Sequence, residues 1–169
     1  DAAANVYQEA ISIANSFDDT QTVAWCEAAL GDLQRKQGDY DTALAWLEKA
    51  RAGFESIDAQ AGVAQVLHTE GTLAAMQGDL ENAQKRYQRG LMIRRQIEDD
   101  QGVAALLLNL GIIAHQSGQY DDAQNLYQES LDLAQKINDK RHVGLSLINL
   151  GYVALDQHDY SQAQTCLLY

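Results

Sequence analysis

The chain has 169 residues, of which 46% are hydrophobic and 21% are charged, so it carries enough apolar surface for a packed core and is not disordered. Lys and Arg number 12 against 24 Asp and Glu, which gives a net charge of -12. Because this charge repels phosphate groups at long range, we expect no direct binding to nucleic acid or to an anionic membrane.

The two cysteines, Cys26 and Cys166, lie far apart in the sequence, with no C-x-x-C motif and no paired histidines nearby. They therefore predict neither a zinc site nor a disulfide framework, and we expect both thiols to be reduced. No apolar run approaches the length that a bilayer crossing needs. These features together lead us to expect a cytoplasmic protein.

The sequence repeats itself at a constant spacing of about 40 residues, which lies in the range of known repeat architectures, and the copies align without gaps. Three columns keep one residue type in all four copies. They are a valine column (Val23, Val63, Val103, Val143), a glycine column (Gly31, Gly71, Gly111, Gly151) and an alanine column (Ala43, Ala83, Ala123, Ala163). For the glycine column alone, chance agreement has odds on the order of a few in ten thousand. The chain is therefore built from internal repeats.

The pattern divides the chain into one partial unit, three complete repeats and a truncated one. In chain order these are 1–19 as the second helix of a partial repeat, the repeats 20–59, 60–99 and 100–139, and the truncated repeat 140–169. Because the pattern starts and stops inside a repeat, we expect this chain to be one fragment of a longer solenoid.

Each repeat is predicted to contain two helices, since its apolar residues recur at spacings of three and four. An aspartate caps the first helix, a left-handed glycine ends it, and an acidic residue occupies the first turn of the second helix. The caps are Asp19, Asp99 and Asp139, the stops are Gly38, Gly78 and Gly118, and the first-turn acids are Asp41, Glu81 and Asp121. In the last repeat His158 replaces the glycine, and a positive φ there would cost about 1 kcal/mol.

Residue size explains why the glycine and alanine columns recur. We expect both to let two antiparallel helices approach closely, while a large side chain one turn after each alanine fills the space beside them. These large residues are Leu47, Tyr87, Tyr127 and Leu167. Because a single hairpin cannot bury its own apolar face, successive hairpins must stack on one another.

These residues resemble the tetratricopeptide repeat, which couples Leu-Gly in its first helix to Ala-x-x-x-aromatic and a small residue in its second. Leu110-Gly111 and the series Ala123, Tyr127 and Ser130 fit, whereas Glu70 replaces the leucine before Gly71. The resemblance implies an all-α, right-handed superhelical solenoid of antiparallel helix hairpins. The unit is longer than the roughly 34 residues that are usual in this family. It is similar to the repeats of kinesin light chains, of bacterial quorum-peptide receptors and of sensor arrays in ATPase-linked transcription regulators.

In this family the first helices line a concave groove, so the resemblance implies a set of ligand-contacting positions, which we call the groove residues. They are Trp25, Ala28, Asp32, Arg35, Gln65, His68, Thr72, Ala105, Leu108, Ile112, His115, Leu145, Ile148, Tyr152 and Leu155, together with Asn109 and Asn149. We expect Leu108, Ile112, Ile148 and Tyr152 to form an apolar surface suited to a peptide helix. The alternative is that neighbouring first helices or further repeats bury these side chains. Likewise, Asn109 and Asn149 either bind a ligand backbone or make structural hydrogen bonds.

The histidines and the basic residues suggest no catalytic or metal centre. No two of the four histidines lie three or four residues apart on a predicted helix, so we expect no metal, no cofactor and no enzymatic activity. A basic cluster is best interpreted as an outer face that pairs with nearby carboxylates. It comprises Lys85, Arg86, Arg89, Arg94 and Arg95.

The leading hypothesis is a scaffold for protein–protein or peptide interaction that uses the concave groove. The alternative is a ligand-sensing regulatory segment of a larger multidomain signalling or transcription-regulating ATPase. The partner would then be a protein or peptide, and uncapped apolar ends would permit end-to-end self-association of the fragment.

Overall fold

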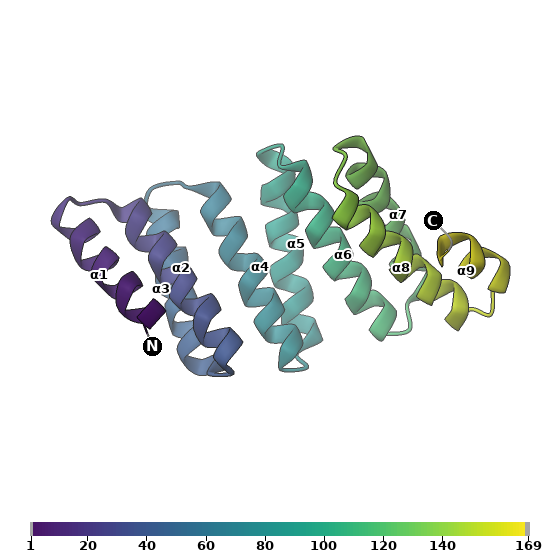
Figure 1. The fold of residues 1–169 in the computed structure, drawn as a ribbon, viewed down its shortest axis with the longest axis horizontal. Helices are drawn as coiled ribbons and strands as arrows, with labels where there is room; N and C mark the ends of the chain where they lie inside the picture. The colour runs from purple at the N-terminus through teal and green to yellow at the C-terminus, as the bar shows by residue number, and fades with distance from the viewer. Residues whose placement is uncertain (1, 168–169) are drawn as a thin grey trace. The chain divides into compact units, whose positions relative to one another are not determined.

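Residues 2–167 are described by a computed structural model, and within that range every regular element is an α-helix. The helices are α1 (Ala2–Ser16), α2 (Thr20–Gln37), α3 (Tyr40–Ser56), α4 (Gln60–Met76), α5 (Leu80–Gln96), α6 (Asp100–Gln116), α7 (Tyr120–Lys136), α8 (Lys140–Asp156) and α9 (Tyr160–Leu167). Short turns join them (Figure 1). The even-numbered helices begin at Thr20, Gln60, Asp100 and Lys140, at the same spacing as the sequence repeat. The predicted all-α fold is confirmed.

The predicted aspartate caps begin three of these helices. Asp19, Asp99 and Asp139 each accept a hydrogen bond from a backbone N–H three residues later, at 3.0, 2.9 and 3.1 Å. In contrast, α4 follows Ala59, which has no side chain able to cap it. The caps therefore fix the start of α2, α6 and α8 by satisfying backbone donors that have no partner within the helix.

A left-handed residue ends each first helix, as the glycines predict. The backbone φ is 84° at Gly38, 80° at Gly78, 73° at Gly118 and 62° at His158. The prediction of a strained histidine in the last repeat is thus confirmed.

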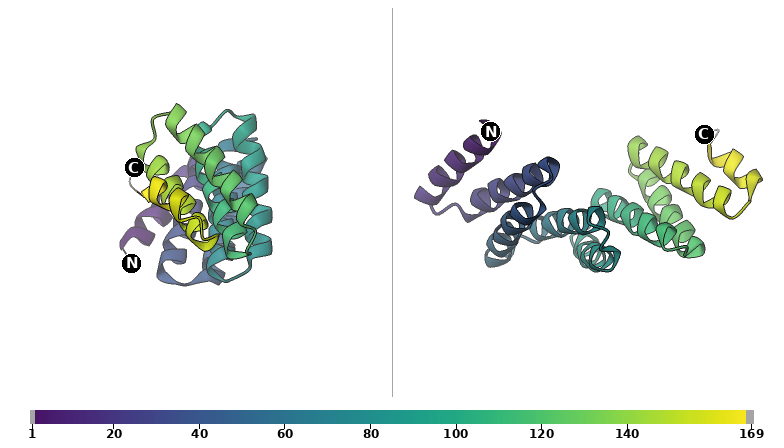
Figure 2. Two further views of the ribbon diagram at one scale, coloured as in Figure 1. Left: turned by 90° about the vertical axis from the view of Figure 1, so that its right-hand side faces the viewer. Right: turned by 90° about the horizontal axis from the view of Figure 1, so that it is seen from below.

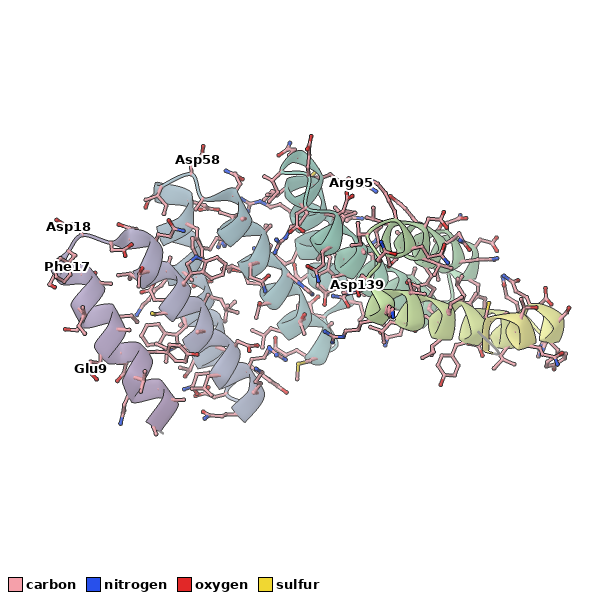
Figure 3. The ribbon with its side chains drawn as sticks, turned by 45° about the horizontal axis from the view of Figure 1, so that its top comes forward. Glu9, Phe17, Asp18, Asp58, Arg95 and Asp139 are labelled. Carbon is pink, nitrogen blue, oxygen red and sulfur yellow. The ribbon has the colours of Figure 1, made fainter. Side chains whose placement is uncertain are left out.

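The turns that follow the second helices also contain a left-handed residue, and the sequence analysis missed it. These residues are Asp18, Asp58, Glu98 and Asn138, with φ between 54° and 58°. Figure 3 labels Asp18 and Asp58 where the chain turns into the next helix. Asn and Asp tolerate this conformation better than most residues, which explains three of the four.

The helices form two compact units, which we describe separately: Asp1–Ile93 and Arg94–Tyr169. In the first unit, α1 contacts α2, α2 and α3 form an antiparallel hairpin, and α4 packs on both. In the second unit, α6 and α7 form the corresponding hairpin, α8 packs on both, and α9 packs on α8. Figure 2 shows these hairpins from two further sides. Packing between chain neighbours is the pattern of a helical solenoid.

The glycine column marks the places where a large side chain of the second helix lies against the first. A Cβ atom on Gly71 would lie 2.5 Å from Cε1 of Tyr87, and one on Gly111 would lie 2.5 Å from Cε1 of Tyr127. Contacts of Cβ atoms below 3.0 Å are essentially never found. Only glycine therefore leaves room for these rings, and Tyr127 is completely buried beside it.

The first complete repeat uses the same packing with an aliphatic residue. A Cβ atom on Gly31 would lie 2.8 Å from Cγ of Leu47 and 3.2 Å from the carbonyl oxygen of Ala43. The alanine column is also buried, since Ala43, Ala83 and Ala123 are 0% exposed. The expected close approach is therefore confirmed in three repeats, whereas the side chain of Leu167 lies outside the described residues.

Glu70, which departs from the family pattern, is buried in an ion-paired network within the first unit. Its carboxylate Oε1 accepts a hydrogen bond from Nε of Arg51 on α3 at 3.1 Å. Its Oε2 lies 3.0 Å from Nη1 of Arg86 on α5, although the angles are not those of a hydrogen bond. Only 2% of the Glu70 side chain is exposed, so two arginines replace the apolar contacts of a leucine.

Candidate interaction surface

The groove residues of α2 are joined to one another by polar contacts. Asp32 accepts a hydrogen bond from Nη2 of Arg35 at 2.6 Å and lies 2.7 Å from Nζ of Lys36. Partial burial of Asp32 opposes its ionisation, but the hydrogen bonds from Lys36 and Arg35 outweigh burial and lower the carboxyl pKa. Trp25 is 43% exposed and packs edge-on against Phe54, with ring centroids 4.8 Å apart.

The groove residues of α4 continue this polar surface within the first unit. Tyr87 donates a hydrogen bond from its hydroxyl to Oγ1 of Thr72 at 3.2 Å, and its ring meets that of His68 at 5.9 Å. Burial raises the pKa of the Tyr87 hydroxyl. Nη1 of Arg35 reaches Sδ of Met76 at 3.4 Å and so links α2 to α4. The first unit therefore offers donors and acceptors that lie between its first helices.

In the second unit, the expectation that Leu108 belongs to an open apolar surface is wrong. Leu108 is only 5% exposed and lies in a core cluster with Tyr127 and Leu150. Ile112 is half-buried and packs against the same cluster. The reason is that α8 packs beside α6 and covers these positions, which is the alternative that the sequence analysis left open for them.

The groove residues of α8 are exposed, and we call four of them the apolar stripe. The exposed fractions are 38% for Leu145, 45% for Ile148, 53% for Tyr152 and 37% for Leu155. Spacings of three and four place them along one face of the helix. The side-chain amide of Asn149 donates to the carbonyl of Leu145 at 2.8 Å, within the same helix. The apolar stripe therefore continues along about three turns of α8.

His115 lies beside the end of the apolar stripe. Its Nε2 is 2.7 Å from Oδ2 of Asp156 on α8, and its ring meets the ring of Tyr120 at 5.7 Å. A second histidine, His142, contacts the capping carboxylate of Asp139 at 2.7 Å. Among residues 2–167, no three His, Cys, Asp or Glu side chains lie close enough together to hold a metal ion.

The hydroxyl of Tyr127 has no hydrogen-bond partner, although the equivalent hydroxyl of Tyr87 has one. The difference comes from the first helix, where Ile112 occupies the position that Thr72 holds in the preceding repeat and offers no oxygen. Burial raises the pKa of the Tyr127 hydroxyl well above its usual range. A buried polar atom without a partner costs stability. In this repeat the apolar side chain of Ile112 therefore stands where the preceding repeat has a hydrogen bond.

The basic cluster pairs with carboxylates, as the sequence analysis expects. Arg89 binds Glu55 at 3.1 Å and Arg95 binds Glu129 at 2.5 Å, and each pair joins residues of successive repeats. Both ion pairs connect the second helix of one repeat to the second helix of the following repeat. Several of the contacts that sequence reasoning missed, such as His115 with Asp156, also span about one repeat. The constant spacing of the repeat was therefore the signal that could have found them.

Crossing a bilayer requires a long, apolar helix. None of the helices within residues 2–167 combines the length and the apolar character that a membrane span needs.

Solved structures with the same fold show what this chain is similar to. BtubC (BKLC) from P. vanneervenii superposes with a TM-score of 0.85 at 22% identity, over 96% of this chain and 68% of that one. A Signal Transduction ATPase with Numerous Domains from Pyrococcus horikoshii, which has a tetratricopeptide repeat sensor, gives 0.81 at 20% identity, over 92% of this chain and 24% of that one. These matches confirm the expected solenoid fold.

A third match is a structure solved with a peptide. The Rap conjugation gene regulator of the plasmid pLS20, in complex with the Phr* peptide, gives a TM-score of 0.73 at 18% identity. The match covers 90% of this chain and 42% of the regulator. Curated protein sequences give no significant match. The tetratricopeptide repeat model matches residues 1–56, 29–96, 62–136 and 102–168, and this chain therefore belongs to the tetratricopeptide repeat family.

Proposed function

We propose that this chain is a non-catalytic scaffold that binds a protein or peptide segment through its groove residues. The observation that carries the proposal is the apolar stripe, whose four large side chains are 37% to 53% exposed along one face of α8. Contiguous apolar surface of this kind is a mark of interaction sites on soluble proteins. An amphipathic helix recognises such a surface with side chains spaced three and four residues apart.

The polar groove residues of the first unit support the same function by a different chemistry. Tyr87 and Thr72 place hydroxyl groups beside the imidazole of His68, and Arg35 is held by Asp32. Peptide backbones present both N–H and C=O groups, which such side chains can bind. Contacts of Asn109 and Asn149 with a ligand backbone remain a prediction.

The test is selection of binding peptides from a displayed random library with the whole chain. We expect enriched sequences whose binding is lost in Ile148→Ser and Tyr152→Ser. Leu44→Ser on α3 is the matched control, because Leu44 has a similar exposed fraction of 39% but is not a groove residue. A library that yields no binder, or binders lost only in the control variant, would contradict the proposal.

A second candidate is the ligand-sensing segment of a larger signalling ATPase. It is favoured by the match to the sensor-containing ATPase, of which this chain spans 24%. A nucleotide-binding domain encoded in the same parent protein would support this role. A parent protein made only of repeats would exclude it.

Two further parts of the proposal concern location and self-association. Both Cys26 and Cys166 are free thiols, which fits a reducing compartment such as the cytoplasm. On α1, Val6, Ile13 and Phe17 are 64%, 55% and 77% exposed, which favours end-to-end association of this chain.

A further inference from the structure

Each repeat packs on the next through side chains that can be compared from one pair of repeats to another. We call the packing of 20–59 on 60–99 the first junction, of 60–99 on 100–139 the second, and of 100–139 on 140–169 the third. The stability of a solenoid is approximately a sum of repeat stabilities and of such nearest-neighbour contacts. Because the repeats share one register, packing on a wrong repeat is excluded only if the junctions differ from one another.

Two aligned positions at each junction are matched in size. At the first junction, a Cβ atom on Gly62 would lie 2.4 Å from Cδ1 of the buried Phe54. At the second junction, a Cβ atom on Gly102 would lie 2.7 Å from Cδ of Arg94, whose side chain is only 12% exposed. At both junctions a large side chain therefore occupies the space that a glycine leaves open on the next helix.

The third junction has the opposite sizes at the same aligned positions. Ala134 stands where Phe54 and Arg94 stand, and His142 replaces the two glycines. Ala134 is 0% exposed and the side chain of His142 is 13% exposed, so neither residue faces open solvent. Each of the three junctions thus combines one large side chain with one small one.

A second pair of aligned positions is matched in charge. At the first junction, the carboxylate of Glu55 accepts a hydrogen bond from Nη2 of Arg89 at 3.1 Å. At the second junction the signs are reversed, because Nη2 of Arg95 donates to Glu129 at 2.5 Å. Both pairs join residues that are 34 positions apart. The two junctions therefore carry the same ion pair in opposite senses.

From these matches we infer that the junctions fix the order of the repeats, so that each repeat accepts its natural successor and rejects the others. The partner of each packing face is then one particular repeat, and packing in a wrong register is disfavoured within one chain and between two copies. Nothing in this inference depends on the proposed function, because it concerns how the repeats recognise one another.

Charge disfavours two of the wrong arrangements. Packing 20–59 directly on 100–139 would place Glu55 opposite Glu129, although the sizes at the other pair of positions would fit. Packing 60–99 on the same repeat of a second copy would place Arg95 opposite Arg89. Like charges that face each other are a common means of rejecting wrong partners.

Size disfavours the remaining arrangements. Phe54 or Arg94 opposite His142 would place two large side chains in the space of one, which overfills the interface. Ala134 opposite either glycine would place two small residues together and leave a void. Size and charge together therefore leave each repeat with one well-matched successor.

The first experiment recreates wrong neighbours in the whole chain and measures unfolding in urea. Arg95→Glu places two glutamates opposite each other, Glu129→Arg places two arginines opposite each other, and the double variant has the ion pair of the first junction. In this double-mutant cycle, the contacts of each residue within its own helix cancel. We expect both single variants to be less stable, with a coupling of at least about threefold in the unfolding equilibrium constant.

The control cycle moves one charge away from the junction. It combines Arg95→Glu with Asp122→Arg, because Asp122 lies on α7 two turns before Glu129, about 10 Å away along the helix axis. Its coupling should be close to zero at about 0.1 M salt, where the Debye length is about 10 Å.

The second experiment tests the matching of size. Gly62→His places an imidazole opposite Phe54, as packing on the wrong repeat would do, and should lower the urea midpoint. Adding Phe54→Ala recreates the small-then-large pair of the third junction. We expect the double variant to be more stable than Gly62→His alone, although it has lost a buried ring.

Three results would overturn the inference. They are a coupling of zero between residues 95 and 129, an equal coupling in the Asp122 control, and a double variant at residues 54 and 62 that is less stable than Gly62→His. If Gly62→His does not fold, the cycle of Arg95 and Glu129 decides alone, since both side chains are 52% exposed and their replacement leaves the core intact.

Discussion

The sharpest prediction about stability compares an enclosed glycine of the glycine column with an open glycine outside it. Gly111 lies under Tyr127, where a Cβ atom would be 2.5 Å from Cε1 and 2.7 Å from Cδ1. Gly144 also lies in the body of a first helix, α8, yet a Cβ atom there meets nothing within 4 Å. Gly111→Ala and Gly144→Ala are therefore the same chemical change in two different surroundings.

The expected sizes follow from packing and helix propensity. Replacing glycine by alanine inside a helix stabilises it by about 1 kcal/mol, and Gly144→Ala should gain this amount. Gly111→Ala gains the same amount, but the ring of Tyr127 must move about 1 Å to reach an ordinary contact distance of about 3.5 Å. Because that ring is 0% exposed, the overpacking costs about 1–3 kcal/mol.

The two variants should therefore differ by about 1–3 kcal/mol in the free energy of unfolding. Urea denaturation followed by circular dichroism measures this difference, and thermal unfolding should show a gap of about 2–4 °C per kcal/mol. Equal stability of Gly111→Ala and Gly144→Ala would refute the account of why glycine recurs in this column.

Four other predictions concern single side chains, the last of them an exposed residue that follows α1. Tyr127→Phe should leave stability unchanged or raise it, because the hydroxyl that is removed has no partner; a loss of more than about 1 kcal/mol in urea denaturation would show a hidden hydrogen bond. Glu70→Gln should destabilise the chain by about 1.5–3 kcal/mol, since Arg51 and Arg86 then lose the carboxylate that they share, and a calorimetric change near zero would contradict this. Hydrogen bonds from His142 lower the pKa of the Asp139 carboxyl in the folded chain. The stability that this cap contributes is therefore present above the pKa of the unfolded chain and is lost as pH falls through the pKa of the folded chain. Asp139→Asn should reduce the loss of stability in acid, and identical acid unfolding curves for the two proteins would contradict this. Phe17→Ser should shift light-scattering mass toward the monomer, and a wild-type chain that stays monomeric at high concentration would exclude end-to-end association.

Much of the fold could be predicted because the four copies of the repeat can be compared with one another. Four aligned copies reveal which positions must be small, and the structure places Gly71 and Gly111 under tyrosine rings as that pattern requires. The caps at Asp19, Asp99 and Asp139 are also local signals, since each binds an N–H only three residues away. Features that depend on a few neighbouring residues can therefore be predicted from the sequence.

The candidate surface could be predicted only in part, because exposure depends on the next helix along. Leu108 and Ile148 occupy the same place in successive repeats, but their exposed fractions are 5% and 45%. The residue type at this aligned position does not predict the difference in exposure. Glu70 is a similar case, since a carboxylate at a leucine position becomes understandable only when Arg51 and Arg86 converge on it from neighbouring helices.

The most direct test of the proposed recognition is an amide chemical-shift map of the whole chain titrated with a peptide enriched in the library selection. The account predicts that the largest changes fall on α8 between Leu145 and Leu155, on the face of the exposed side chains. Changes confined to the second helices α3 and α7, with α8 unaffected, would contradict it.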